Sequence, residues 1–181
     1  MRSKKGRGLD SIERILKGKV VVVGIGNTLK GDDGFGSELV QRLQGRMDAV
    51  CIDAGSAPEN YLGSVVKENP DTLLLVDAVE MGLAPGEFRI MKPEEILDTC
   101  VSTHDVSLRM LVDFIMNVRE CDVYLLGVQP ESVRFGDAIS KPVSDAIDEL
   151  ETAIAGGTSR GRLSSVHPSP GGISPRDCTI F

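Results

Sequence analysis

The chain has 181 residues and a formal net charge of −7 at pH 7. Its length fits one globular domain with a substantial core. The acidic balance argues against nucleic-acid binding, which relies on clustered Lys and Arg side chains that displace counterions from phosphates.

Strand patterns recur along the chain as short apolar runs. Runs rich in β-branched residues and leucine predict strands at Lys19–Val23, Val50–Asp53, Leu73–Asp77 and Val123–Val128. Their continuity is typical of parallel strands that are buried on both faces. A further strand at Gly86–Met91 begins at a Pro-Gly turn, and we expect it at a sheet edge.

Helical periodicity separates these runs. The residues expected on one face of each helix are Phe35, Leu39, Val40 and Leu43; Tyr61, Leu62 and Val65; Val106, Met110, Phe114 and Ile115; and Val143, Ile147, Leu150 and Ile154. The alternation predicts an α/β fold, a three-layer doubly wound and mostly parallel twisted sheet of about five strands with helices on both faces. From Gly156 onward Gly, Ser, Pro and Arg replace the apolar period, so we expect one domain over residues 1–155 and a flexible tail over 156–181.

Cysteine usage and hydropathy predict a compartment. The four cysteines are scattered without a C-x-x-C pair, which indicates neither a zinc knuckle nor a disulfide framework. The longest apolar runs, Val20–Val23 and Leu73–Val76, are far too short to span a bilayer, and no apolar segment follows the basic residues 1–7. We therefore expect a reduced, cytoplasmic protein without membrane insertion.

The segment Val20–Gly36 leads from a predicted strand into a glycine turn that ends in two adjacent carboxylates. In open α/β sheets such turns lie at the crevice where ligands bind. A dinucleotide site needs a third glycine where this chain has Leu29, and the anions of Asp32 and Asp33 would repel a phosphate. Asp53, at the end of the second strand, resembles a ribose-binding acid and keeps a nucleotide-binding module as an alternative.

Three residues capable of chemistry are expected at one sheet edge. In a parallel sheet, Asp33 follows the first strand, Asp77 ends the third, and His104 precedes a helix that must return from the same edge. Two carboxylates and an imidazole suit a borderline divalent ion such as nickel or zinc and leave an open coordination position. Structural roles are the alternatives: Asp32 or Asp33 as turn formers or a helix cap, Asp77 as an acceptor for loop amides, and His104 as a solvated residue beside a cap.

A Ser or Cys nucleophile is less well supported. The chain has no Gly-x-Ser-x-Gly elbow, and Ser56 stands in a sequence typical of a turn. Cys51 falls in an apolar run, which favours core packing. His167 lies in the predicted tail, so any chemistry that needs an imidazole falls to His104.

Five segments carry a resemblance to a known family. They are Gly24–Gly36, Asp53–Asn60, Val76–Glu87, Ser102–His104 and Leu126–Pro130. In this order they resemble the [NiFe]-hydrogenase maturation endopeptidases, most closely the type that processes the large subunit of the formate-linked hydrogenase 3. Many members carry Asp-Glu where this chain has two aspartates, and nothing functional is transferred to residues 1–18 or to the predicted tail.

The resemblance implies an endopeptidase that removes the C-terminal extension of a hydrogenase large-subunit precursor after nickel insertion. The family's metal-site residues fall on Asp33, Asp77 and His104, nickel would arrive with the precursor, and no organic cofactor is implied. Either the ion polarises the peptide carbonyl or activates water, with a carboxylate as general base, or an aspartate-centred mechanism uses nickel only for recognition. A non-catalytic nickel checkpoint that binds the precursor is the alternative. We expect a monomer, because the amphipathic helices account for most apolar residues.

Overall fold

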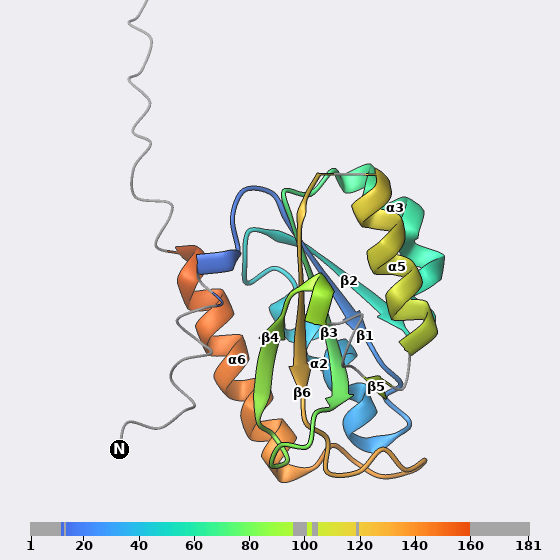
Figure 1. The fold of residues 1–181 in the computed structure, drawn as a ribbon. Helices are drawn as coiled ribbons and strands as arrows, with labels where there is room; N and C mark the ends of the chain where they lie inside the picture. Colours follow the sequence, from blue (N-terminus) through green and yellow to red (C-terminus); the bar gives the residue numbers. More distant parts are fainter. Residues whose placement is uncertain (1–11, 13, 96–100, 103–104, 119, 160–181) are drawn as a thin grey trace, which may run out of the picture.

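The computed structural model describes residues 12, 14–95, 101–102, 105–118 and 120–159. Its elements, with η for a 3-10 turn, are β1 (Val20–Ile25), η1 (Gly31–Gly34), α2 (Phe35–Leu43), β2 (Ala49–Gly55), η2 (Pro58–Tyr61), α3 (Leu62–Glu68), β3 (Thr72–Glu80), β4 (Phe88–Met91), β5 (Val101–Ser102), α5 (Asp105–Val118), β6 (Asp122–Val128) and α6 (Lys141–Ser159). Figure 1 shows one sheet with helices on both faces.

The main sheet has the strand order β2-β1-β3-β6-β4. Neighbours among β2, β1, β3 and β6 are parallel, whereas β4 runs antiparallel to β6 at the edge. The predicted mostly parallel sheet and the edge position of the added strand are therefore confirmed. The short β5, which no sequence pattern indicated, pairs antiparallel with the end of β3.

Alternate residues of β1 enter two separate cores. Val20 and Val22 pack with residues of α2 and α6, while Val21 and Val23 pack with residues of α3 and α5. This division follows from the alternation of side chains across a strand. In Figure 1, α6 and α2 cover one face of the sheet and α3 and α5 the other, which makes the predicted three-layer, doubly wound arrangement.

Helix α5 buries only part of the predicted face: Ile115 is buried as expected, and the side chain of Val106 lies outside the described ones. Met110 and Phe114 are 54% and 42% exposed, so their assignment to the core face is wrong. The buried residues are Leu108, Leu111, Val112 and Ile115. Their i, i+3, i+4, i+7 spacing forms the stripe that meets the sheet, and it leaves a second apolar row exposed on the helix.

Strand β2 is only partly buried. Of its seven residues, Ala54 alone is fully buried. The expectation of burial on both faces is wrong here because β2 lies at the edge of the sheet and has only β1 as a neighbour. The other three parallel strands have partners on both sides.

Helix α6 extends beyond the predicted domain boundary. Its apolar face is confirmed, since Val143, Ile147, Leu150 and Ile154 are buried. The helix continues through Gly156 to Ser159, because a glycine costs a helix only about 1 kcal/mol and the preceding turns are anchored in the core. The predicted tail from residue 160 onward lies outside the described residues. No helix in the described ranges is long and apolar enough to cross a membrane.

The residues before β1 contribute to the core. Ile12 is fully buried among residues of α2 and α6, and Ile15 and Leu16 pack against the same core. The hydroxyl of Thr72 donates to the carbonyl oxygen of Lys17 at 2.8 Å, which fixes this segment to the start of β3. Nothing in the sequence pattern had assigned these residues to the core.

Candidate active site

Asp33 lies in η1, the turn that follows β1, and its side chain is 1% exposed. The Asn27 N–H donates to Asp33 Oδ2 at 3.2 Å and to the Asp33 carbonyl oxygen at 3.1 Å. Gly26 has a φ of 144°, and a Cβ there would lie 1.8 Å from that carbonyl oxygen. The glycine therefore allows the chain leaving β1 to close directly against Asp33.

Asp77 lies in β3 and is fully buried. Its Oδ1 accepts a hydrogen bond from the Ala78 N–H at 2.8 Å. A Cβ on Gly36 would lie 2.3 Å from the Val76 carbonyl oxygen, so the start of α2 rests directly on this part of β3. Since η1 leads straight into α2, Asp33 and Asp77 both lie at the carboxyl-end side of the sheet.

His104 lies outside the described residues, so its predicted position is not tested. The flanking elements are described: Ser102 of β5 pairs with Val79 of β3, and α5 begins at Asp105. Among the residues with described side chains, a set that lacks His104, no three His, Cys, Asp or Glu side chains form a possible metal site. The site of Asp33, Asp77 and His104 therefore stays a prediction.

Asp32 has a structural role that the sequence did not reveal. Its side chain is fully buried, and Oδ1 accepts from the Ser140 N–H at 2.7 Å. Oδ2 accepts from the Glu131 N–H at 2.7 Å, the Ser132 N–H at 3.2 Å and the Ser140 hydroxyl at 2.9 Å. Asp32 thus fastens the loop between β6 and α6 to η1. The helix-cap alternative is wrong, because α2 begins at the N-cap Gly34 without a side-chain cap.

Gln129 is a second positioning residue, and it is 4% exposed at the end of β6. Its Oε1 accepts from the Met81 N–H at 2.7 Å and the Leu83 N–H at 3.2 Å, while its Nε2 donates to Glu80 Oε1 at 2.8 Å. The side chain therefore ties the connection after β3 to β6. Its place in the segment Leu126–Pro130 was the only sequence signal for it.

Asp53 is engaged within the protein. It accepts from the Ser37 hydroxyl at 2.7 Å, Gln41 Nε2 at 2.9 Å and the Gly55 N–H at 3.2 Å. Partial burial opposes ionisation, but these three hydrogen bonds outweigh it and lower the pKa of Asp53. The backbone N–H of Asn27, next to the glycine turn, donates a hydrogen bond to Asp33 Oδ2. Both contacts disfavour the nucleotide-binding alternative, which needs an open amide cradle and a carboxylate turned to the ligand.

Cys51 fits the predicted packing role. It lies partly buried in β2 and packs against the core beneath α2 and α6. Burial raises the pKa of its thiol, which favours the unreactive protonated form. Ser56 is exposed in the turn after β2, as its sequence context predicted.

A doubly wound sheet with buried carboxylates at the carboxyl-end side of its strands defines an α/β protein, a class in which ligands generally bind at that side. The family model for hydrogenase maturation protease (HycI) matches residues 35–156. The chain belongs to this family of proteases, as the five sequence segments indicated.

Individual relatives agree with this assignment. The chain is 36% identical over 151 residues to the hydrogenase 3 maturation protease of Escherichia coli K12, which covers 81% of this chain and 95% of that protein. The crystal structure of the [NiFe] hydrogenase maturation protease HycI from Thermococcus kodakarensis KOD1 is similar with a TM-score of 0.75 and 32% identity, covering 82% and 99%. The solution structure of the endopeptidase HycI from Escherichia coli has a TM-score of 0.68 and 34% identity, covering 77% and 90%.

Proposed function

We propose that the chain is an endopeptidase that removes the C-terminal extension of a [NiFe]-hydrogenase large-subunit precursor after nickel insertion and recognises the bound nickel. The observation that carries this proposal is the pair of buried carboxylates, Asp33 and Asp77, at one side of the sheet in a chain of this family. The proposal includes a cytoplasmic, monomeric enzyme that needs no organic cofactor.

The proposed donor set suits nickel that arrives with the substrate. Carboxylate oxygens and an imidazole nitrogen are suitable ligands for a borderline divalent ion. In the sequence His104 stands two residues after Ser102, which pairs with Val79 near the end of the strand that carries Asp77. We propose that Asp33, Asp77 and His104 complete the coordination of the precursor's nickel and place the scissile bond beside it.

Hydrolysis then requires the same bond changes by either of two routes. Water adds to the scissile carbonyl carbon, a carboxylate accepts a proton from that water, and the leaving amine gains a proton as the C–N bond breaks. In one route the precursor's nickel polarises the carbonyl or activates the water; in the other, an aspartate acts alone and nickel serves for recognition. An Asp77→Asn variant that still binds only loaded precursor but no longer cuts it would show that Asp77 serves in hydrolysis and is not required for recognition of nickel.

The decisive experiment compares nickel-loaded and nickel-free forms of the cognate precursor. Each is incubated with the purified protein, and its intact mass is measured. We expect loss of a C-terminal peptide from the loaded form only. Loss of the peptide from both forms would contradict nickel recognition. Binding of the loaded form without cleavage would contradict the endopeptidase and favour the non-catalytic nickel checkpoint.

A further inference from the structure

Three exposed apolar side chains lie on the two loops that meet at η1. Leu29, Val133 and Phe135 are 60%, 38% and 76% exposed. Leu29 belongs to the connection between β1 and η1, and the other two belong to the loop between β6 and α6. The Gly136 N–H donates to the Leu29 carbonyl oxygen at 2.8 Å, which brings the two loops together. We call Leu29, Val133 and Phe135 the rim patch.

The rim patch adjoins the candidate site. The Lys30 N–H donates to the Asn27 carbonyl oxygen at 2.9 Å, and the Asp33 N–H donates to the Lys30 carbonyl oxygen at 3.2 Å. Leu29 and Asp33 are therefore parts of one compact turn. Figure 1 shows the orange loop between β6 and α6 close to the blue segment that carries η1, at the lower end of the sheet.

The loops that carry the rim patch are held firmly. The Gly31 N–H donates to the Asp137 carbonyl oxygen at 3.1 Å and the Asp32 N–H to the Ser132 carbonyl oxygen at 2.9 Å. The Asp32 carboxylate adds its bonds to the same loop, including the one to the Ser140 N–H at 2.7 Å. Apolar side chains on such preordered loops can bind a partner without a large entropic cost of loop ordering.

Exposed cations accompany the apolar residues. Lys30 follows Leu29, Arg134 stands between Val133 and Phe135, and neither forms an ion pair with another residue in the described part of the chain. The same loop carries the exposed acids Glu131 and Asp137, and the Asp137 carboxylate accepts from the Ser132 hydroxyl at 2.6 Å. Lys30 and Arg134 thus form no ion pair with a described acid, in a chain whose net charge is −7. Two such cations favour a carboxylate on the bound segment.

We propose that the rim patch binds the part of the precursor that flanks the scissile bond, and that this part is an apolar peptide segment carrying a carboxylate. The inference rests on the proposed endopeptidase function, because such an enzyme must hold its substrate chain beside the reacting bond. Apolar contacts at the rim supply affinity, and Lys30 and Arg134 orient the segment.

Binding of purified nickel-loaded precursor tests this proposal. Phe135→Ser should raise the dissociation constant about tenfold or more. Phe114→Ser is the control, because it removes the same type of side chain from an exposed position on α5 and should leave the dissociation constant within about twofold. Arg134→Glu should weaken binding and reduce its dependence on salt. In cleavage assays Phe135→Ser should raise KM with little change in kcat, because the contact is present before and during reaction.

Each contrary outcome has a distinct meaning. If Phe135→Ser binds the loaded precursor with unchanged affinity and the parent protein cleaves it normally, the rim-patch proposal is wrong and the endopeptidase proposal stands. Equal weakening by Phe114→Ser also overturns the rim-patch proposal. If Phe135→Ser converts a dimer to a monomer without altering precursor affinity, the occupant is a second copy and the proposal is wrong. Patch-dependent binding without cleavage by the parent protein supports the rim patch and refutes only the endopeptidase.

Discussion

Replacement of Asp32 by asparagine is the most informative perturbation of this fold, because it changes charge and hydrogen bonding with almost no change in shape. The carboxylate accepts from three backbone N–H groups and one hydroxyl, all on the loop between β6 and α6. The partners are 99 to 108 residues away in sequence. The decrease in the free energy of unfolding on replacement therefore measures a tertiary connection and not local turn propensity.

The expected magnitude follows from the donors around each oxygen. An asparagine side chain has one acceptor oxygen and one NH₂ donor group. If NH₂ replaces Oδ1, it faces the Ser140 N–H; if it replaces Oδ2, it faces the N–H groups of Glu131 and Ser132. Either orientation leaves at least one N–H without its acceptor and removes the charge from the others. Because a hydrogen bond to a charged group contributes about 1.5–3 kcal/mol, Asp32→Asn should lower the free energy of unfolding by about 2–4 kcal/mol.

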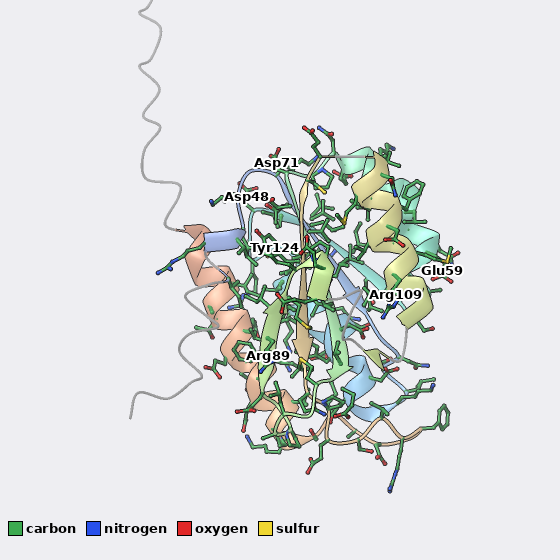
Figure 2. The ribbon with its side chains drawn as sticks, in the orientation of Figure 1. Asp48, Glu59, Asp71, Arg89, Arg109 and Tyr124 are labelled. Carbon is green, nitrogen blue, oxygen red and sulfur yellow. The ribbon has the colours of Figure 1, made fainter. Side chains whose placement is uncertain are left out.

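Urea unfolding monitored by circular dichroism measures this loss. Asp48→Asn is the control, since Asp48 is exposed and precedes β2 at the opposite end of the sheet (Figure 2), and it should change stability by less than about 0.5 kcal/mol. Adding Ser140→Ala to both backgrounds should show coupling with Asp32 and none with Asp48. A loss for Asp32→Asn no larger than for the control, or strictly additive effects with Ser140→Ala, would refute the view that Asp32 fastens the loop.

Three further predictions concern α2, Asp53 and His104. Gly36→Ala would place a Cβ 2.2 Å from the Ile25 carbonyl oxygen, so it should lower the free energy of unfolding in urea by about 1–3 kcal/mol. The lowered pKa of Asp53 implies stability that is present above its unfolded pKa near about 4 and lost as pH falls through the lower folded pKa. Asp53→Asn should therefore flatten the acid side of the stability profile, and an unchanged profile would contradict this. His104→Ala should abolish precursor cleavage, read by intact mass, with an unchanged unfolding midpoint; normal cleavage would remove His104 from the site.

The fold could be predicted from sequence where the apolar pattern of a single segment was sufficient to indicate its structure. The run Val20–Val23 supplies apolar side chains to both faces of β1, and such runs indicate a strand covered on both sides whatever the register. Helix α5 shows where this reasoning weakens. It carries two apolar rows, and periodicity alone did not show which of them meets the sheet.

The positions of Asp33 and Asp77 at one side of the sheet could be predicted because parallel topology brings the carboxyl ends of strands together. The contacts of Gln129 could not, since they depend on where the connection after β3 passes the end of β6. No periodicity encodes the meeting of two irregular segments. Only the presence of Gln129 in a family segment marked it for attention.

The adjacent residues Asp32 and Asp33 have different contacts, and the sequence did not predict this difference. In a 3-10 turn successive side chains are about 120° apart, so two neighbouring carboxylates must point in different directions. Asp32 meets the donors of Glu131, Ser132 and Ser140, whereas Asp33 Oδ2 accepts from Asn27 within its own turn. The sequence identifies an acidic pair in a turn after the first strand, but only the contacts with the distant loop show that Asp32 fastens that loop. Four donors occupy both oxygens of Asp32, so Asp32 holds the loop between β6 and α6 to η1.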